Sequence, residues 1–370
     1  MKKIILVIGT RPEAIKLIPV YIELKKSDLF DVVIVSTGQH KEMLTQIFSF
    51  FGVQPEIELN LMTHNQSLAQ ITALLFTHLD KVIGEVKPHL VVVQGDTTTA
   101  MVAAMVGFYH QIKVAHIEAG LRSFNKLAPF PEEINRKVIS QVADFHFTPT
   151  QQSYNNLINE SAGNIHLVGN TVIDSLLLAK DKVEKDAERY QSKYADIIHF
   201  ERKIILITAH RRESFGNGLQ NICKAIQTLS LRYEELEFVF PVHLNPNIKA
   251  PVEELLGKIS NVHLLPPVQY DDMIFLMSRS HIILTDSGGV QEEAPSFHVP
   301  LIVLRDVTER PEGLEAGCSV IGGTDTARII DVFSRVYTEK AVYDNMRNKS
   351  NPYGDGMASG RFAEIIKDYI

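Results

Sequence analysis

The sequence predicts an α/β protein with two Rossmann-like domains, each built on a doubly wound parallel sheet. Six short apolar runs occur in each half of the chain, and helical stretches separate most of them. Continuous apolar strands that alternate with helices are typical of a parallel sheet covered on both faces. The length of 370 residues also favours two domains over one.

The expected strands follow one another in two sets. In the first half they cover residues 4–8, 32–35, 90–93, 112–117, 145–148 and 165–168. In the second half they cover residues 204–207, 238–242, 262–265, 282–284, 301–304 and 319–321. The charged stretch between the sets, residues 174–202, contains no apolar run and predicts a long helix with a connector between the domains.

Composition excludes several classes of protein. The net charge is −7 and the chain has no Lys/Arg-rich block, which argues against a nucleic-acid partner. The two cysteines, Cys223 and Cys318, provide no disulfide framework and fit a reducing compartment. The apolar run at 4–8 is too short for a signal peptide, and no run is long enough to span a membrane. We therefore expect a cytoplasmic protein.

The motif that directs the functional interpretation is the segment 285–295, TDSGGVQEEAP, which follows a buried strand. Ser287, Gly288 and Gly289 predict a tight turn into a short helix, whose first N–H groups lack partners inside the helix. Such donors, with the helix dipole, bind phosphate. Glu293, one turn later, is placed to hold a ribose hydroxyl. The alternative is an ordinary strand-to-helix turn.

Polar residues also follow the strands of the first half, where ligands of doubly wound sheets bind. Arg11 and Lys16 follow the first strand, and Asp96 and Glu118 follow two later ones. Asp96 also fits a helix cap. The pair His116 and Glu118 lacks a third ligand at helpful spacing, so no metal site is expected.

Two further sets complete this pattern. Glu132 and Arg136 are four residues apart on an expected helix, where a surface salt bridge is the alternative to a catalytic carboxylate. In the second half His210, His243 and Arg310 follow expected strands in the same way as Ser287. The absence of a Gly-x-Gly-x-x-Gly pattern excludes a dinucleotide fingerprint. Arginine binds phosphate oxygens bidentately, so the second domain suits a diphosphate and the acidic first domain suits a sugar.

Eight strings carry a resemblance to a known family: GTRPEAIK, QGDTTT, HIEAGLR, PFPEEINR, TAHRRE, VHLNP, TDSGGVQEEAP and RDVTERPEG. Together they resemble the non-hydrolysing UDP-N-acetylglucosamine 2-epimerases over almost the whole chain. The resemblance implies a GT-B fold, with two domains that face a cleft. It implies residues 1–170 as the domain of the sugar and the catalytic carboxylates, with a C-terminal helix at 358–370 packing back on it, and residues 171–357 as the UDP-binding domain. It also implies a homodimer.

The family interconverts UDP-GlcNAc and UDP-ManNAc by inverting sugar carbon 2. The proton on that carbon is not acidic, and the sequence offers no NAD site that would create an adjacent carbonyl, so no cofactor is expected. The resemblance implies elimination of UDP to 2-acetamidoglucal, followed by re-addition of UDP with a proton arriving on the other face. A role in bacterial surface polysaccharide synthesis is the expected context.

The resemblance also assigns residues. The catalytic candidates are Asp96 and Glu132 for proton transfer at carbon 2, Glu118 for steadying positive charge on the ring, and His210 for the departing phosphate. Which carboxylate serves which face stays open. The substrate-binding candidates are Arg11, Lys16, Arg136, Arg211, His243, Val268, Met273, Ser287, Gly288, Gly289, Glu293 and Arg310. Many bacterial members bind a second UDP-GlcNAc as an activator, and His40, Gln46 and Gln70 lie in the matching region.

Three alternatives use the same residues differently. A GT-B glycosyltransferase would move the sugar from a UDP-sugar donor to an acceptor. A hydrolysing epimerase would release free ManNAc and UDP. A sensor of sugar nucleotides would bind without turnover.

Overall fold

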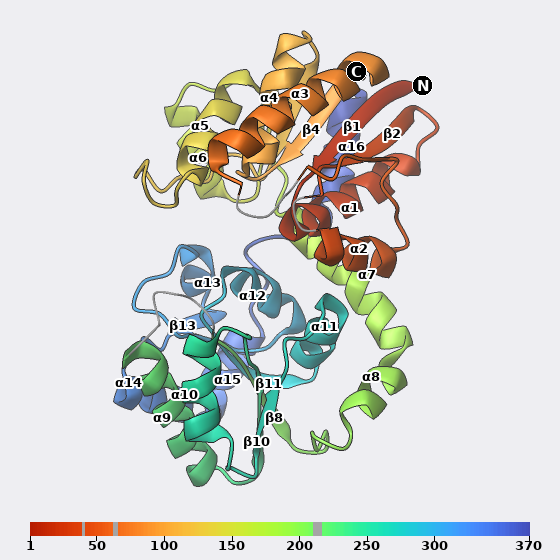
Figure 1. Cartoon of the computed structure of the whole chain (residues 1–370). Helices are drawn as coiled ribbons and strands as arrows, with labels where there is room; N and C mark the ends of the chain where they lie inside the picture. Colours follow the sequence, from red (N-terminus) through yellow and green to blue (C-terminus); the bar gives the residue numbers. More distant parts are fainter. Residues whose placement is uncertain (39–40, 62–65, 210–216) are drawn as a thin grey trace. The chain divides into compact units, whose positions relative to one another are not determined.

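The structure of the protein is a computed structural model that describes residues 1–38, 41–61, 66–209 and 217–370 (Figure 1). The chain divides into two compact units, one comprising Met1–Leu177 with Gly354–Ile370 and the other Leu178–Tyr353. Each unit contains one parallel β-sheet with helices packed around it. The predicted fold class, two doubly wound α/β domains, is confirmed.

The first unit has a seven-stranded sheet in the order β3-β2-β1-β4-β5-β6-β7. Its strands are β1 (Lys2–Ile8), β2 (Phe30–Ser36), β3 (Ile57–Glu58), β4 (Leu90–Gln94), β5 (Lys113–Ile117), β6 (Phe145–Thr148) and β7 (Ile165–Leu167). Its helices are α1 (Arg11–Lys25), α2 (Lys41–Phe51), α3 (Leu68–Val86), α4 (Thr98–Tyr109), α5 (Glu132–Val142), α6 (Gln151–Asn159) and α16 (Ala358–Lys367), with the first part of α7 (Thr171–Lys185).

The second unit has a six-stranded sheet in the order β10-β9-β8-β11-β12-β13. Its strands are β8 (Lys203–Thr208), β9 (Leu236–Pro241), β10 (Val262–Leu265), β11 (Ser280–Thr285), β12 (Leu301–Val303) and β13 (Ser319–Ile321). The helices around it are α8 (Ala187–Tyr194), α9 (Asn217–Arg232), α10 (Pro246–Leu256), α11 (Tyr270–Ser278), α12 (Gly288–Glu293), a 3₁₀ helix (Ala294–Phe297), α13 (Pro311–Ala316), α14 (Thr326–Thr338) and α15 (Lys340–Arg347).

Two elements differ from the sequence prediction. Strand β3 was not predicted, because it has only two residues and neither is fully buried, so it leaves no apolar run. The charged stretch after residue 170 forms two helices, α7 and α8, with Asp186 between them.

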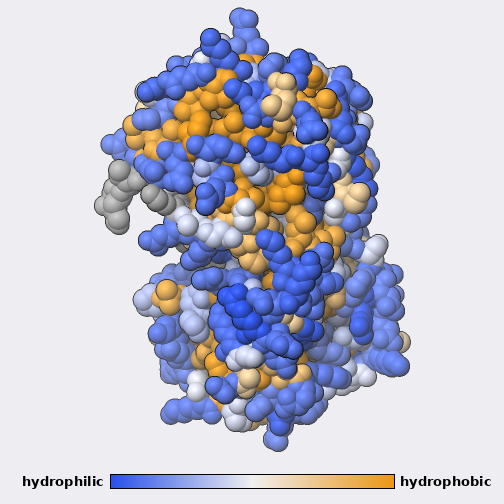
Figure 2. Space-filling model, turned by 90° about the vertical axis from the view of Figure 1, so that its right-hand side faces the viewer, coloured by the Kyte–Doolittle hydropathy of each residue, from blue (hydrophilic) through white to orange (hydrophobic). Residues whose placement is uncertain are grey.

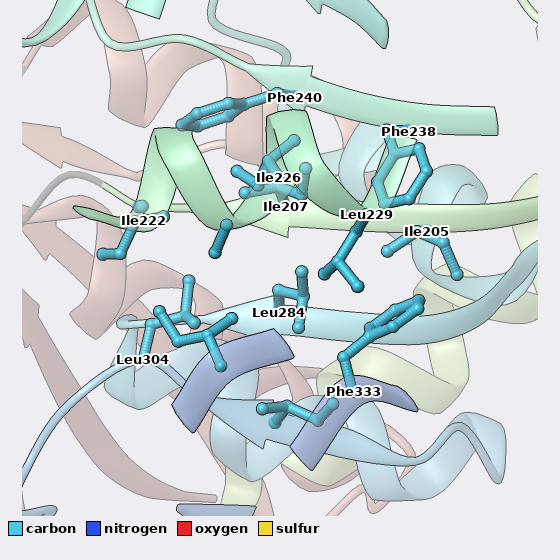
Figure 3. Packing of buried hydrophobic residues seen from close by; sticks show 14 of the residues in the cluster. Ile205, Ile207, Ile222, Ile226, Leu229, Phe238, Phe240, Leu284, Leu304 and Phe333 are labelled. Atoms are coloured by element: carbon cyan, nitrogen blue, oxygen red, sulfur yellow. The ribbon is translucent and has the colours of Figure 1, made fainter. Parts of the chain in front are cut away.

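The core of the second unit shows why apolar runs predicted its strands. Figure 3 shows the side chains of Ile205 and Ile207 on β8 lying among Phe238 and Phe240 on β9 and Phe333 on α14. All five are fully buried. Burying one such side chain contributes about 1.5–3 kcal/mol, which fixes the face that each helix turns to the sheet.

Helix α16 belongs to the first unit although it follows the whole second unit in sequence. The carboxylate of Asp174 accepts hydrogen bonds from the backbone N–H groups of Ala358 (3.3 Å) and Ser359 (2.7 Å) at the start of this helix. Phe362 packs edge-to-face on Phe147 of β6, with ring centres 4.6 Å apart. These contacts attach the C-terminal helix to α7 and to β6 of the first sheet.

On the face shown in Figure 2, hydrophobic residues form patches separated by hydrophilic ones. Within the described ranges, none of the helices combines the length and apolar character that crossing a membrane requires.

Candidate active site

Glu118 lies directly after β5, with both carboxylate oxygens engaged. Its Oε1 atom is 2.5 Å from the ammonium of Lys16 on α1, and its Oε2 atom accepts a hydrogen bond from the amide of Gln94 at the end of β4. The backbone of Glu118 has φ = 62°, a left-handed conformation that non-glycine residues adopt mainly where the surroundings impose it. Three elements thus fix one buried carboxylate in place.

Asp96, two residues after β4, is paired with Arg136 of α5. The guanidinium donates to Asp96 Oδ2 from Nε at 2.9 Å and lies 2.7 Å away through Nη2, and Asn135 Nδ2 donates to the Asp96 carbonyl at 2.9 Å. Arg136 also contacts Glu133 at 3.1 Å. The alternative interpretation of this helix, a surface salt bridge between Glu132 and Arg136, is not what the described structure shows: Arg136 turns toward the loop that carries Asp96, a contact that helical spacing cannot reveal.

The second acidic residue of α5, Glu133, holds the loop before the helix. Its carboxylate accepts hydrogen bonds from the backbone N–H groups of Ser123 (3.0 Å) and Phe124 (3.1 Å). Burial alone would raise the pKa of Glu133, but these donors and Arg136 lower it below its usual range. Glu132, the first residue of α5, is half-buried. The sequence pattern singled out Glu132 and missed the adjacent Glu133. The two glutamates differ in burial, because the side chain of Glu133 is fully buried.

Helix α1 begins at Arg11, which is half-buried, and Pro12 occupies its second position. Glu13 in its first turn is fully buried and accepts hydrogen bonds from Gly9, Thr10 and Thr97. Burial raises the pKa of Glu13 to about 7, despite these hydrogen bonds. Sequence reasoning missed Glu13, although the pattern Thr10-x-x-Glu13 is that of a capping box.

His116 is buried in β5, and its Nε2 atom lies 2.7 Å from the carbonyl oxygen of Gly95. Burial lowers the pKa of His116 to about 3, so the ring is neutral and supports the turn before Asp96. No group of three or more His, Cys, Asp or Glu residues that could hold a metal ion occurs among the residues that the structure describes.

In the second unit the predicted phosphate turn opens α12. Ser287 is the N-cap, its backbone N–H donates to Thr285 Oγ1 at 3.0 Å, and Gly288 and Gly289 are the first helical residues. A Cβ on Gly289 would meet only Ser287 Oγ, at 4.0 Å. The glycines thus expose the helix start, and both have helical backbone rather than the special turn conformation expected. Glu293, the last residue of α12, is buried.

Arg310 is attached to the same helix. Its guanidinium forms an ion pair with Glu292 of α12. Its backbone N–H donates to Thr308 Oγ1 (3.1 Å), and the Thr308 hydroxyl donates to Gln291 (2.6 Å). The loop of Arg310 is therefore anchored to α12 by two contacts, one from Arg310 and one from Thr308.

The remaining candidates fall at several places. His243 follows β9 and is exposed, with its Nδ1 accepting a hydrogen bond from Asn245 N at 3.1 Å. Val268 lies in the segment after β10 and Met273 on α11, both half-buried. Gln46 on α2 and Gln70 on α3 are exposed, and Gln70 caps its own helix by accepting from Ser67 N at 2.8 Å. His40, His210 and Arg211 lie outside the described residues.

Each unit thus gathers part of the predicted set at the carboxyl ends of its strands. In the first unit, hydrogen bonds or ion pairs join Lys16 to Glu118 and Asp96 to Arg136. In the second unit, they join the helix of the glycine turn to Arg310. The first cluster combines fixed negative charge with cations at the carboxyl ends of β4 and β5, and the second places backbone donors of a helix start beside a guanidinium. Proton transfer and anion binding are the chemistries that such groups provide.

Comparisons with known proteins identify the family. The family model described as UDP-N-acetylglucosamine 2-epimerase matches residues 22–367. The UDP-N-acetylglucosamine 2-epimerase of Neisseria meningitidis is 45% identical over 98% of this chain and 99% of its own length, and that of Bacillus subtilis is 44% identical over 98% and 94%. The crystal structure of the Neisseria meningitidis enzyme bound to UDP-GlcNAc matches 99% of this chain and 100% of that chain, with a TM-score of 0.91. The chain therefore belongs to the UDP-N-acetylglucosamine 2-epimerase family.

Proposed function

We propose that the protein interconverts UDP-GlcNAc and UDP-ManNAc by inverting carbon 2 of the sugar, without hydrolysis. The observation that carries this proposal is the arrangement of Asp96 and Glu118 with Arg136 and Lys16 at one edge of the first sheet. It occurs in a chain whose full-length relatives are named UDP-N-acetylglucosamine 2-epimerases.

The reaction is an elimination followed by an addition. A base removes the proton from carbon 2 while the bond between carbon 1 and the UDP oxygen breaks, and UDP carries away that electron pair. The 2-acetamidoglucal then takes up a proton at carbon 2 on the opposite face as UDP returns to carbon 1. The enzyme must retain both UDP and the glycal and must exclude water, because escape of either fragment or attack by water would end the reversible cycle.

The contacts of the carboxylates favour different roles. Glu118 has both oxygens held, by Lys16 and Gln94, and its side chain is only 7% exposed, which suits a fixed negative charge near a positively charged ring. Asp96 is held through Oδ2 and keeps 26% of its side chain exposed, which suits transfer of a proton. Glu132 is the second proton-transfer group, on the other face of carbon 2. His210 assists the departing phosphate.

UDP is assigned to the second unit. The side chain of Ser287 and the backbone donors of Gly288 and Gly289 bind the diphosphate with Arg310, and Glu293 binds the ribose. His243 and Arg211 add positive or hydrogen-bonding groups, and Val268 and Met273 line the uracil position. In the first unit, Arg11, Lys16 and Arg136 are the substrate-binding candidates. In terms of domains, residues 1–170 with 358–370 act on the sugar, and 171–357 bind UDP.

Four broader proposals accompany this assignment. The protein works as a homodimer in the cytoplasm, and its product serves bacterial surface polysaccharide synthesis. A second UDP-GlcNAc bound near His40, Gln46 and Gln70 acts as an activator. Light scattering on the purified protein tests the dimer, and sigmoidal dependence of rate on UDP-GlcNAc concentration tests the activator.

Proton NMR of UDP-GlcNAc with the enzyme in D₂O tests the central proposal. We expect UDP-ManNAc to appear without any acceptor, with deuterium at carbon 2 of both sugars. Free ManNAc with stoichiometric UDP would instead identify a hydrolysing enzyme. Unchanged UDP-GlcNAc that reacts only after an acceptor is added would identify a glycosyltransferase, and binding without exchange would identify a sensor.

A further inference from the structure

The first sheet reverses its order between β1 and β4. Strand β2, which follows β1 in sequence, lies on one side of this pair, and β5, which follows β4, lies on the other. Ligands of doubly wound domains bind at this switch point, beside the carboxyl ends of the two strands. The turn after β1 contains Gly9 and Thr10, and the turn after β4 contains Asp96 and Thr97. These two turns border the position in which Asp96 is proposed to act.

The side chain of Glu13 connects the two turns. Its Oε2 atom accepts hydrogen bonds from Gly9 N (3.0 Å) and Thr10 N (2.6 Å), while its Oε1 atom accepts one from the Thr97 hydroxyl (2.6 Å). The side chain of Thr99 also packs closely against the first turn. A Cβ on Gly9 would lie only 2.6 Å from Thr99 Oγ1. With Glu13 only 1% exposed, the two turns are packed tightly around one carboxylate.

Capping of α1 does not by itself explain this carboxylate. Helix α3 has the same type of capping box, formed by Ser67 and Gln70, and there a neutral, exposed amide performs the cap. What distinguishes Glu13 is its contact with Thr97, a residue 84 positions away in sequence. The additional contact joins the start of α1 to the N-cap of α4.

This arrangement is costly for folding. Within the described part of the chain, the hydrogen-bond partners of Glu13 are hydroxyl and backbone N–H groups rather than cations. A buried carboxylate without a cation is destabilised relative to water, and burial accordingly raises the pKa of Glu13 to about 7. Groups whose pKa is strongly shifted cluster at functional sites. At such sites an arrangement that activity requires often lowers the stability of the fold.

We propose that Glu13 is a positioning residue for the epimerisation: through Thr97 it fixes the turn that carries Asp96 against the turn that precedes Arg11. The inference rests on the proposed function, since it concerns the placement of a proposed proton-transfer group. Glu13 acts through Asp96 rather than on the sugar. Its loss therefore displaces the reacting group by a fraction of an ångström, and such displacements lower turnover more than substrate binding.

Glu13→Gln is the decisive variant, because it keeps the shape and most hydrogen bonds while replacing one accepting oxygen with an amide. We expect kcat for UDP-GlcNAc epimerisation to fall about 10- to 100-fold with KM little changed. Thr97→Val removes the hydroxyl that donates to Glu13 and should likewise lower kcat with little change in KM. Thr97→Ser keeps that hydroxyl and should restore most of the turnover, which a general loss of packing would not predict.

Glu237→Gln is the matched control, since Glu237 is an equally buried carboxylate on β9 in the second unit. We expect wild-type kcat and KM from it. Wild-type kcat in Glu13→Gln, while the wild-type enzyme exchanges deuterium at carbon 2, would overturn the positioning role and leave the proposed function standing. A KM increase with unchanged kcat would also overturn it. Absence of exchange in the wild-type enzyme would reject the proposed function and, with it, this inference.

Discussion

Replacing Glu13 with glutamine should change how the stability of the first unit depends on pH. The pKa of Glu13 is raised from 4.5 to about 7 in the folded protein, and burial is the main cause. Between these two values the folded state holds a proton on Glu13 more often than the unfolded state, so the contribution of Glu13 to stability is largest at low pH and falls as pH rises. At about 1.4 kcal/mol per pKa unit, the loss between pH 5 and pH 8 amounts to about 2.5 kcal/mol. A glutamine does not titrate and avoids this loss.

Amide hydrogen exchange of α1 and α4 measures this change in stability in the two helices that Glu13 joins. Other titrating groups are common to both proteins, so the difference between wild type and Glu13→Gln isolates Glu13. We expect the variant to gain about 2.5 kcal/mol relative to the wild type on going from pH 5 to pH 8. If the difference in stability between wild type and Glu13→Gln were the same at both pH values, Glu13 would not be a buried group that resists ionisation.

Three other substitutions test the site and the fold. Asp96→Asn should retain UDP binding in calorimetry while deuterium exchange at carbon 2 disappears; full activity would remove Asp96 from the mechanism. Arg122→Met should destabilise the first unit by about 3 kcal/mol in thermal unfolding, because the fully buried guanidinium is paired with Glu160 at 2.6 Å; an unchanged transition would show that this pair contributes nothing. Gly120→Ala should yield little folded protein, since Gly120 has φ = 88° and a Cβ there would lie 2.2 Å from Ser153 O; normal expression and solubility would contradict the packing described.

The parallel sheets could be predicted from sequence because burial on both faces leaves continuous apolar runs. The run at 204–207, for example, corresponds to β8, whose interior residues are fully buried. Strand β3 could not be predicted in this way, since a two-residue edge strand needs only backbone pairing with β2. Its existence is decided by its neighbour rather than by its own side chains.

The same distinction applies to the candidate site. The positions of Asp96 and Glu118 after strands were predictable, because the ends of parallel strands meet at one edge of a sheet. The partners of Arg136 were not, because they depend on how α5 turns against the loop after β4. Glu13 was overlooked for a related reason: its local pattern is an ordinary cap, and only the approach of Thr97 reveals its second contact.

The attachment of α16 to the first unit has a consequence for biosynthesis. Residues 354–370 emerge from the ribosome only after all of residues 178–353, a delay of roughly 10 to 35 s at typical rates of translation. Throughout that interval Phe147 lacks the ring of Phe362 that packs on it. Asp174 likewise lacks the backbone N–H groups from which it accepts hydrogen bonds. The nascent first unit therefore keeps part of the apolar surface of β6 uncovered until the C-terminal helix has been made.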